Sequence, residues 1–380
     1  MHNENAGRIM KVDSKKIYKV AYATGSRADY GIVRHYLGLL NKDCQVKLSI
    51  LVTGSLLDEK YGYQAKLIEE DGFYIESKIS IPIKTSCNAD VLHSMAIALD
   101  KFGEYFQKNK YDLLIILGDR YEMMSVAIAA AMQRIPILHL HGGEATYANY
   151  DEFIRHSITK MSMYHFTATE VYKQRVIQLG EVPERVFNLG ALGAENCCEI
   201  GDNYVGKSVK QLKAKSYFVV LFHPETITDV DVLEQTKKLL NALEKFSNYK
   251  FVFIGANADT HSDKIRQTVD VFVAEHSNAL YYENLHTDAY HYLLKNSIGL
   301  IGNSSSGIIE APSLGIYTIN IGDRQKGRVR GNSIIDVKCE TNEICRAIEQ
   351  IQNKREYLDI DNPYYQKDSA NNYYIKTMEI

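Results

Sequence analysis

Short apolar runs alternate with longer amphipathic stretches along the whole chain. The apolar runs predict strands at residues 17–23, 46–52, 113–117, 136–140, 165–169 and 186–190 in the first half, and at 217–222, 251–254, 279–282, 298–301 and 317–321 in the second. The run LLIIL at 113–117 is apolar at every position, which is typical of a central strand buried on both faces. Alternation of strands with helices predicts parallel sheets joined by right-handed crossovers.

Helical periodicity is clearest at residues 29–40, 121–134 and 229–245. The chain has 380 residues, and because domains usually hold about 100–200 residues, two are expected. We predict a disordered leader at 1–16, an N-terminal domain at 17–200, a C-terminal domain at 201–361 and a tail at 362–380. The polar, tyrosine-rich tail is interpreted as a final helix that packs on the first domain or as a frayed end.

Charge and cysteine content narrow the class of protein. The 44 basic and 47 acidic residues nearly cancel, so neither nucleic acid nor an anionic membrane is an expected partner. No apolar run approaches the roughly 20 residues that a membrane helix needs. The six cysteines include no CxxC pair and suit free thiols in a reducing cytoplasm. We expect a cytoplasmic protein, and nothing in the sequence requires a metal ion or NAD.

Charged side chains gather directly after predicted strands, where open α/β sheets bind their ligands. In GSRADY, after the first strand, Arg27 is placed to reach a phosphate and Asp29 either contacts a ligand or caps the next helix. In GDRYE, after LLIIL, Asp119 and Arg120 form a second pair. For Asp119, too, helix capping is the alternative interpretation.

The densest group follows the strand PILHL. It comprises the segments HLHGGE and DEFIRH, with His139, His141, Glu144, Asp151, Glu152, Arg155 and His156. Strand alternation predicts that the first two histidines share a face, and helical spacing predicts that Asp151 and Arg155 share a side of the next helix. A single histidine here is best interpreted as a core residue, but the whole group indicates function. Metal binding by the two histidines is one interpretation, and the flanking charges suit acid–base catalysis as well.

The second half supplies a predicted anion site. His223, in FHPET, follows the first strand of that half. The segment GNSSSGIIE offers small residues before a helix, as a phosphate cradle requires, with Glu310 placed for ribose hydroxyls. The segment GDRQKGR adds positive charge one βα unit later. The residues predicted to bind here are Asn303, Ser304, Ser305, Ser306, Gly307, Glu310, Arg324 and Arg328.

These motifs together resemble a known family. From about residue 18 to the C-terminus, GSRADYG, GDRYE, HLHGGE, DEFIRHSITK, FHPET, GNSSSGIIEAP and GDRQKGR occur in the order of the hydrolysing UDP-N-acetylglucosamine 2-epimerases of sialic acid biosynthesis. The resemblance implies two Rossmann-like domains in the glycosyltransferase-B architecture. It also implies a C-terminal helix that crosses back onto the first domain, and a homodimer or homotetramer.

The resemblance further implies a reaction in which a base removes the C2 proton, UDP leaves C1, and water adds to the glycal. The products are UDP and N-acetylmannosamine. The implied catalytic residues are Asp119, Asp151, His141, Glu144, His223, Arg120 and Arg155, with His223 supporting UDP departure. The implied binding residues are Arg27, Asp29, His156, Asn257 and the serine-loop and arginine residues named above.

One position departs from the family pattern, because better-known members carry glutamate where this chain has His141. The related substrate UDP-2,4-diacetamido-2,4,6-trideoxyglucose is therefore an alternative. Two alternatives from other classes are a glycosyltransferase with the same architecture and a sensor that binds sugar nucleotides without turnover. Turnover of the UDP-sugar without an acceptor distinguishes a hydrolysing epimerase from both the glycosyltransferase and the sensor.

Overall fold

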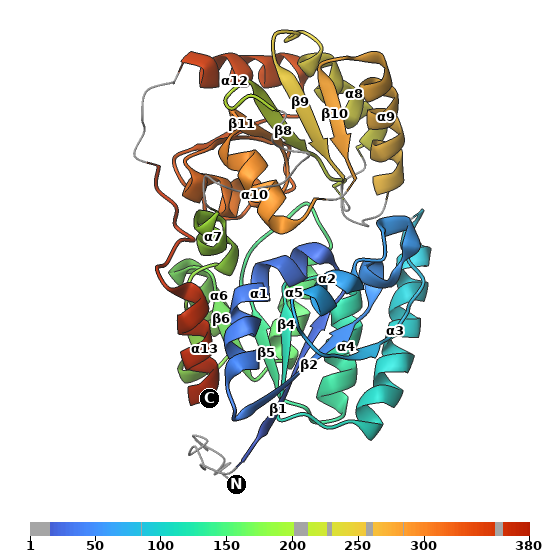
Figure 1. Ribbon diagram of the computed structural model, residues 1–380, viewed down its shortest axis with the longest axis vertical. Coiled ribbons are helices and arrows are strands. Elements are labelled where there is room, and N and C mark those ends of the chain that lie inside the picture. Colours follow the sequence, from blue (N-terminus) through green and yellow to red (C-terminus); the bar gives the residue numbers. More distant parts are fainter. Residues whose placement is uncertain are drawn as a thin grey trace.

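Two parallel sheets, one in each half of the chain, organise the protein (Figure 1). The computed structural model describes residues 16–84, 86–200, 212–225, 230–255, 261–283, 285–353 and 360–380. The predicted leader, apart from residue 16, lies outside the described residues, as does Asn257. The structure gives no test of those two predictions.

The N-terminal sheet has the strand order β3-β2-β1-β4-β5-β6-β7 within the described residues. Its strands are β1 (Tyr18–Thr24), β2 (Val46–Val52), β3 (Ile75–Lys78), β4 (Leu113–Leu117), β5 (Ile137–Leu140), β6 (Tyr164–Thr167) and β7 (Val186–Asn188). All neighbouring strands pair in parallel. The order reverses between β1 and β4, so the carboxyl ends of these two strands form a topological switch point.

The C-terminal sheet repeats this plan with the order β10-β9-β8-β11-β12-β13. Its strands are β8 (Tyr217–Leu221), β9 (Lys250–Ile254), β10 (Ala279–Tyr282), β11 (Gly299–Gly302), β12 (Tyr317–Ile321) and β13 (Ile334–Val337). Pairing is again parallel, and the switch point lies between β8 and β11. Two Rossmann-like sheets facing each other confirm the predicted two-domain α/β class.

Helices connect the strands and cover both sheets (Figure 1). In the N-terminal half they are α1 (Arg27–Lys42), α2 (Ala65–Glu70), α3 (Asn88–Lys108), α4 (Tyr121–Met132), α5 (Asp151–Met161), α6 (Glu170–Gln178) and α7 (Leu192–Asn196). In the C-terminal half they are α8 (Val232–Leu243), α9 (Ser262–Glu275), α10 (Thr287–Lys295), α11 (Ser306–Ile309), α12 (Thr341–Asn353) and α13 (Ser369–Glu379). Five short 3₁₀ turns also lie in the described residues: η1 (Gly54–Leu57), η2 (Glu59–Tyr61), η3 (Pro183–Arg185), η4 (Cys197–Glu199) and η5 (Ala311–Leu314).

Strand β4 shows how the apolar pattern builds the core. Leu113, Ile115 and Leu117 enter one apolar cluster of the N-terminal domain, while Leu114 and Ile116 enter the cluster on the opposite face. All five residues are buried. A strand covered by helices on both sides must be apolar at every position, and this is the physical reason for the LLIIL run.

The chain ends by returning to the domain in which it began. Helix α13 packs against α1 in the N-terminal domain (Figure 1). The ring of Tyr373 lies edge-on to those of Tyr36 and Phe166, at centroid distances of 5.6 and 5.1 Å. The hydroxyl groups of Tyr36 and Thr377 are 2.7 Å apart. The predicted crossover helix is confirmed, and the alternative of a frayed end is not.

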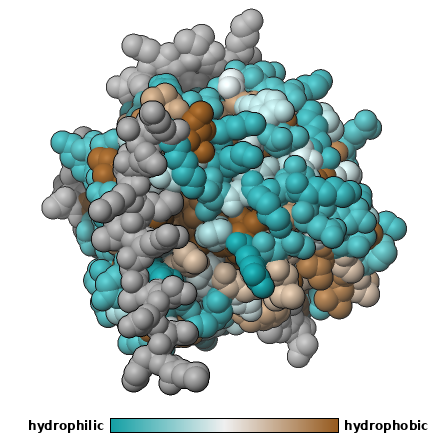
Figure 2. Space-filling model, turned by 90° about the horizontal axis from the view of Figure 1, so that it is seen from below, coloured by the Kyte–Doolittle hydropathy of each residue, from teal (hydrophilic) through white to brown (hydrophobic). Residues whose placement is uncertain are grey.

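The end of the molecule that carries α13 is mostly hydrophilic, with hydrophobic areas scattered between polar ones (Figure 2). None of the helices in the described part of the chain combines the length and apolar character that a membrane span requires.

Candidate active site

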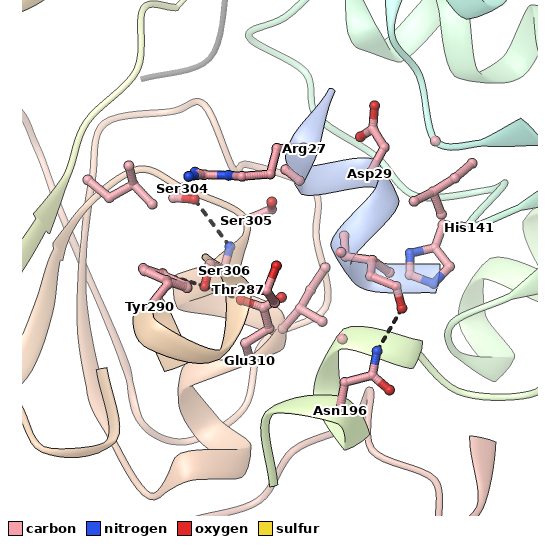
Figure 3. Close-up of a pocket in the computed structure, with 18 of the residues that line it drawn as sticks. Arg27, Asp29, His141, Asn196, Thr287, Tyr290, Ser304, Ser305, Ser306 and Glu310 are labelled. Carbon is pink, nitrogen blue, oxygen red and sulfur yellow. Dashed lines mark hydrogen bonds between the residues drawn. The ribbon is translucent and has the colours of Figure 1, made fainter. Parts of the chain in front are cut away.

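A pocket opens where the two switch points face each other. Its walls come from the loops after β1, β4 and β5 on one side and from those after β8 and β11 on the other. Twelve of the predicted site residues line it: Arg27, Asp29, Asp119, His141, Glu144, Arg155, His223, Ser304, Ser305, Ser306, Glu310 and Arg328. Ten residues from both walls are labelled in Figure 3.

Asp119 is held by an arginine that is itself buried. Arg155, only 1% exposed, donates from Nη2 to Asp119 and from Nη1 to the backbone oxygen of Glu144 at 2.9 Å. Burial alone would raise the pKa of Asp119, but the charges of Arg155 and Arg328 outweigh it and lower that pKa. Asp119 does not cap α4, whose N-terminus has no side-chain cap bond. The pocket therefore contains a stably ionised carboxylate.

The two histidines of HLHGGE lie in different environments. Strand β5 ends at Leu140, and His141 adopts φ +62°, so the expectation that both histidines share a strand face is wrong. His139 remains in the core, where Nε2 lies 2.7 Å from the oxygen of Gly118 and Nδ1 lies 3.0 Å from Oγ1 of Thr159. Burial lowers the pKa of His139 to about 3. His139 is therefore a structural residue and not a pocket residue.

His141 forms part of the pocket wall and is 7% exposed. Its Nδ1 lies 3.8 Å from Oε1 of Glu144, and its Nε2 has no hydrogen-bond partner among the described residues. Burial lowers the pKa of His141, although Glu144 opposes the effect. The imidazole is consequently neutral at neutral pH, with one nitrogen available to a ligand.

The serine loop forms the opposite wall through a chain of hydrogen bonds. Ser304 Oγ accepts from the backbone nitrogen of Ser306 at 3.3 Å, and Ser306 Oγ lies 2.6 Å from the hydroxyl of Tyr290. Ser306 also donates to Glu310, whose Oε2 lies 3.6 Å from Nε2 of His291. The pKa of Glu310 is lowered, because its contacts with His291 and Ser306 outweigh the effect of burial. Ser305 lies between these two serines in the pocket wall, and its hydroxyl has no hydrogen bond within the described residues.

Arg27 brings positive charge to this wall from the other domain. Figure 3 shows it extending from the first turn of α1 toward the serine loop. Its Nη1 is buried and has no hydrogen-bond partner within the described residues. A buried guanidinium beside small residues at a helix start suits a phosphate or diphosphate group.

Six other predicted site residues do not line the pocket: Arg120, Asp151, His156, Asn303, Gly307 and Arg324. Asn303 joins the ends of β8 and β11, since its amide exchanges hydrogen bonds of 2.7 and 2.8 Å with the backbone of His223. A Cβ at Gly307 would lie 2.6 Å from Thr318 Cγ2, so this glycine permits close packing on β12.

The remaining four of these residues are held by neighbouring side chains or backbone. Arg120 Nε donates to Glu122 at 2.6 Å, and His156 Nε2 lies 3.1 Å from a Glu152 oxygen. Arg324 Nη1 donates to the backbone oxygen of Asn303 at 3.2 Å. Asp151 begins α5 one turn before Arg155, and its charge acts on that arginine.

Sequence reasoning missed part of the pocket wall. The missed residues are Gly193 and Asn196 on α7, and Thr287, Tyr290 and His291 on α10. The small-residue turn before α7, at GALG, was a usable signal because it follows a strand. No signal marked α10, since its residues reach the pocket through contact between the domains. A Cβ at Gly31 would lie only 2.3 Å from Thr287 Oγ1.

Within the described residues, no cluster of three or more histidine, cysteine, aspartate or glutamate side chains is placed to hold a metal ion.

The fold and the site together define an α/β enzyme with acid–base groups on one domain and an anion-binding loop on the other. The family model described as UDP-N-acetylglucosamine 2-epimerase matches residues 39–378. The chain belongs to this family and is a UDP-sugar 2-epimerase.

Relatives extend over nearly the whole chain. "Polysialic acid biosynthesis protein P7" of Escherichia coli is 49% identical over 363 residues, which cover 93% of this chain and 92% of that protein. "GDP/UDP-N,N'-diacetylbacillosamine 2-epimerase (hydrolyzing)" of Campylobacter jejuni is 36% identical, with 88% of each chain covered. A structure of the Methanocaldococcus jannaschii UDP-GlcNAc 2-epimerase has a TM-score of 0.78 at 18% identity, covering 93% and 98% of the two chains. This likeness establishes the shared glycosyltransferase-B fold.

Proposed function

We propose that the enzyme is a hydrolysing 2-epimerase that converts UDP-N-acetylglucosamine and water to N-acetylmannosamine and UDP. The observation that carries this proposal is the single pocket that joins Asp119, His141 and Glu144 to Arg27 and the serine loop. A diphosphate on the serine-loop side leaves the attached sugar facing the carboxylates and the neutral imidazole. This is the arrangement that an elimination at C1 and C2 needs.

The proposed chemistry has two halves. In the first, a carboxylate takes the C2 proton, the C2–H electron pair forms the C1=C2 bond, and the C1–O pair leaves with UDP. We assign Asp119 to this proton transfer because it is ionised in the pocket. In the second half, water adds its oxygen to C1 and gives up a proton to a base, while C2 gains a proton from solvent on the face opposite to the one that Asp119 deprotonates. The available Nε2 of neutral His141 is the group we assign to the water.

Other predicted catalytic residues act around this centre. Arg155 fixes Asp119, and we propose that Asp151 acts through Arg155, one helical turn away. His223 lines the pocket, and burial together with Arg324 and Arg120 keeps its pKa well below the usual value. We propose that His223 supports the departing diphosphate as a neutral hydrogen-bond donor.

A second substrate is favoured by the names of two relatives. Besides the Campylobacter enzyme, "UDP-N,N'-diacetylbacillosamine 2-epimerase (hydrolyzing)" of Legionella pneumophila is 34% identical over 89% of this chain. The alternative substrate UDP-2,4-diacetamido-2,4,6-trideoxyglucose would undergo the same reaction. The 49% identity to a protein named for polysialic acid biosynthesis supports N-acetylglucosamine as the first sugar to test.

Proton NMR of the purified protein with UDP-N-acetylglucosamine in heavy water, without an acceptor, tests the proposal. UDP together with N-acetylmannosamine deuterated at C2 is the expected result. UDP-N-acetylmannosamine, in which the sugar keeps its nucleotide, would contradict hydrolysis. If no turnover occurs, the diacetamido-trideoxy sugar is tested in the same way, and its consumption would establish the alternative substrate.

We also propose that the enzyme works as a homodimer or homotetramer in the cytoplasm. The free thiols support a reducing compartment. Light scattering coupled to size exclusion measures the assembly, and a monomer at assay concentration would contradict it.

A further inference from the structure

The carboxyl group of Asp29 interacts with Ser26 but keeps one oxygen unused within the described residues. Asp29 is the third residue of α1, and its backbone nitrogen donates to Ser26 Oγ at 3.2 Å. Ser26 therefore caps the helix, and the capping role considered for Asp29 is excluded. Oδ2 of Asp29 is buried and has no hydrogen-bond partner among the described residues. A buried carboxyl oxygen without a partner, in the wall of a pocket, is available to a ligand.

Asp29 lines the pocket together with Arg27 and Asp119. Arg27, two residues earlier, extends toward the serine loop, while Asp29 leaves the same helical turn in another direction (Figure 3). Asp29 is close enough to Asp119 for their charges to interact. With the diphosphate on the serine loop and the sugar at Asp119, as proposed above, Asp29 would lie near the bond that joins them.

The charges around Asp29 favour its protonated form. The charged groups that face it are Arg120, Glu122 and Asp119. The guanidinium of Arg120 contacts Glu122 at 2.6 Å, and Asp119 is paired with Arg155. The hydroxyl of Tyr22 donates to its backbone oxygen and not to its carboxyl group. Burial raises the pKa of Asp29 to about 7, against the opposing charge of Arg120.

Other pocket groups are poor proton donors at neutral pH. His223 and His141 are neutral because burial lowers the pKa of each. Asp119 and Glu310 are ionised because their partners lower the pKa of each against the effect of burial. A bound diphosphate would add negative charge beside Asp29 and so hold its proton more firmly. Asp29 would therefore be protonated when the substrate is bound.

We propose that Asp29 is the general acid that protonates the departing diphosphate, an inference that rests on the proposed elimination of UDP. As the C1–O bond breaks, its electron pair goes to the phosphate oxygen, and the Asp29 carboxyl proton moves to that oxygen. The base on the sugar side takes the C2 proton. The substrate therefore gains one proton at the departing phosphate oxygen and loses one at C2. Water restores the proton to Asp29 after UDP dissociates.

The first experiment measures binding and does not depend on turnover. Titration calorimetry of UDP at pH 7.5, in two buffers of different ionisation enthalpy, gives the number of protons taken up. The wild type should take up more protons than Asp29→Asn, because the diphosphate raises the pKa of Asp29. The comparison cancels the titration of UDP itself. Equal proton uptake by the two proteins would overturn the proposal, whatever sugar the enzyme turns over.

The second experiment measures kcat. Asp29→Asn should lower kcat by about 10²-fold or more, while UDP affinity changes little. Asp90→Asn is the matched control, since Asp90 is the third residue of α3 and lies outside the pocket. It should leave both kcat and proton uptake unchanged. Wild-type kcat in Asp29→Asn would overturn the proposal.

A third measurement uses the wild-type enzyme alone, in case the variant folds poorly. A general acid must be protonated to act, so kcat should fall as the pH rises above the pKa of Asp29 in the substrate complex. If kcat stays constant from neutral pH to pH ~9, Asp29 is excluded as the general acid.

Discussion

Nη2 of Arg328 lies 2.7 Å from Oε2 of Glu144, and this ion pair joins the C-terminal domain to the N-terminal domain. Both side chains are almost completely buried, at 8% and 2% exposure. The same Glu144 lies beside His141, so the pair connects domain contact with the geometry of the pocket.

Replacing Arg328 with methionine should destabilise the protein by about 3–5 kcal/mol, because it leaves Glu144 charged and buried without its partner. Thermal unfolding measures the loss. Lys60→Met is the matched control, since Lys60 pairs with Asp263 across the same domain boundary at 2.9 Å but on the exposed surface. That control should cost less than about 1 kcal/mol. Equal losses from the two variants would contradict the buried-pair argument.

Asp119→Asn should reduce kcat by about 10²-fold or more, because it removes the ionised carboxylate from the pocket. Asp151→Asn should also reduce kcat, but less, since Asp151 acts through Arg155 and does not line the pocket. UDP release measures turnover, and calorimetry with UDP should give affinities within a few-fold of wild type for both variants. Full activity in either variant would remove that carboxylate from the mechanism.

Ser305→Ala should weaken UDP binding by about 10-fold, in keeping with loss of a hydrogen bond to a charged group. Ser306 donates its hydroxyl proton to Glu310, whereas Ser304 only accepts a backbone hydrogen bond and Ser305 has no side-chain hydrogen bond within the described residues, so Ser305 is a serine that can donate to a phosphate. The melting temperature without UDP should stay unchanged, which separates binding from folding. Unchanged UDP affinity would count against the assignment of this loop to the diphosphate.

Acid should destabilise the protein through two buried histidines on adjacent strands. Burial lowers the pKa of His139 to about 3 and that of His165 to about 4. Both are near 6.5 when unfolded, so their contribution is complete above pH ~6.5 and is lost as the pH falls toward these lowered values. Asp29, with its raised pKa, acts in the opposite direction over part of this range.

The measurement is the melting temperature from pH 7.5 to pH 4.5 in wild type and in the His139→Gln/His165→Gln double variant. The wild type should lose more stability across this range than the variant, because only the wild type must protonate these histidines on unfolding. Parallel curves for the two proteins would show that the histidines do not carry the acid sensitivity.

Strands rich in apolar, β-branched and aromatic residues could be predicted from the sequence, and two of the four edge strands in the described residues could not. The predicted bounds of β2, β4, β10 and β12 agree with the structure residue for residue. Strands β4 and β10 are apolar or aromatic at every position, whereas β2 and β12 include polar residues among apolar ones. Strands β3 and β13 are half-buried edge strands whose sequences, IESK and IIDV, mix apolar with charged residues, and neither was predicted. Helix α3 was also not singled out.

Some of the site residues could also be predicted from the sequence, and others could not. Asp119 and the serine loop could be placed because they directly follow central strands, where a switch point must form. Tyr290 and His291 could not, because their position depends on how α10 of one domain meets α1 of the other. The turn to positive φ at His141 was equally invisible, since a local backbone change moved the side chain off the strand face.

The return of α13 to the first domain has a consequence for the order of assembly. Tyr373 and Thr377 complete the packing around Tyr36, near the start of the chain. During synthesis the N-terminal domain emerges first, yet its apolar surface stays open until the final helix leaves the ribosome. The C-terminal domain must therefore be made, and be able to fold, while its predecessor is still incomplete. A chain that ends before α13 would leave this apolar surface exposed in the N-terminal domain, the part that is synthesised first.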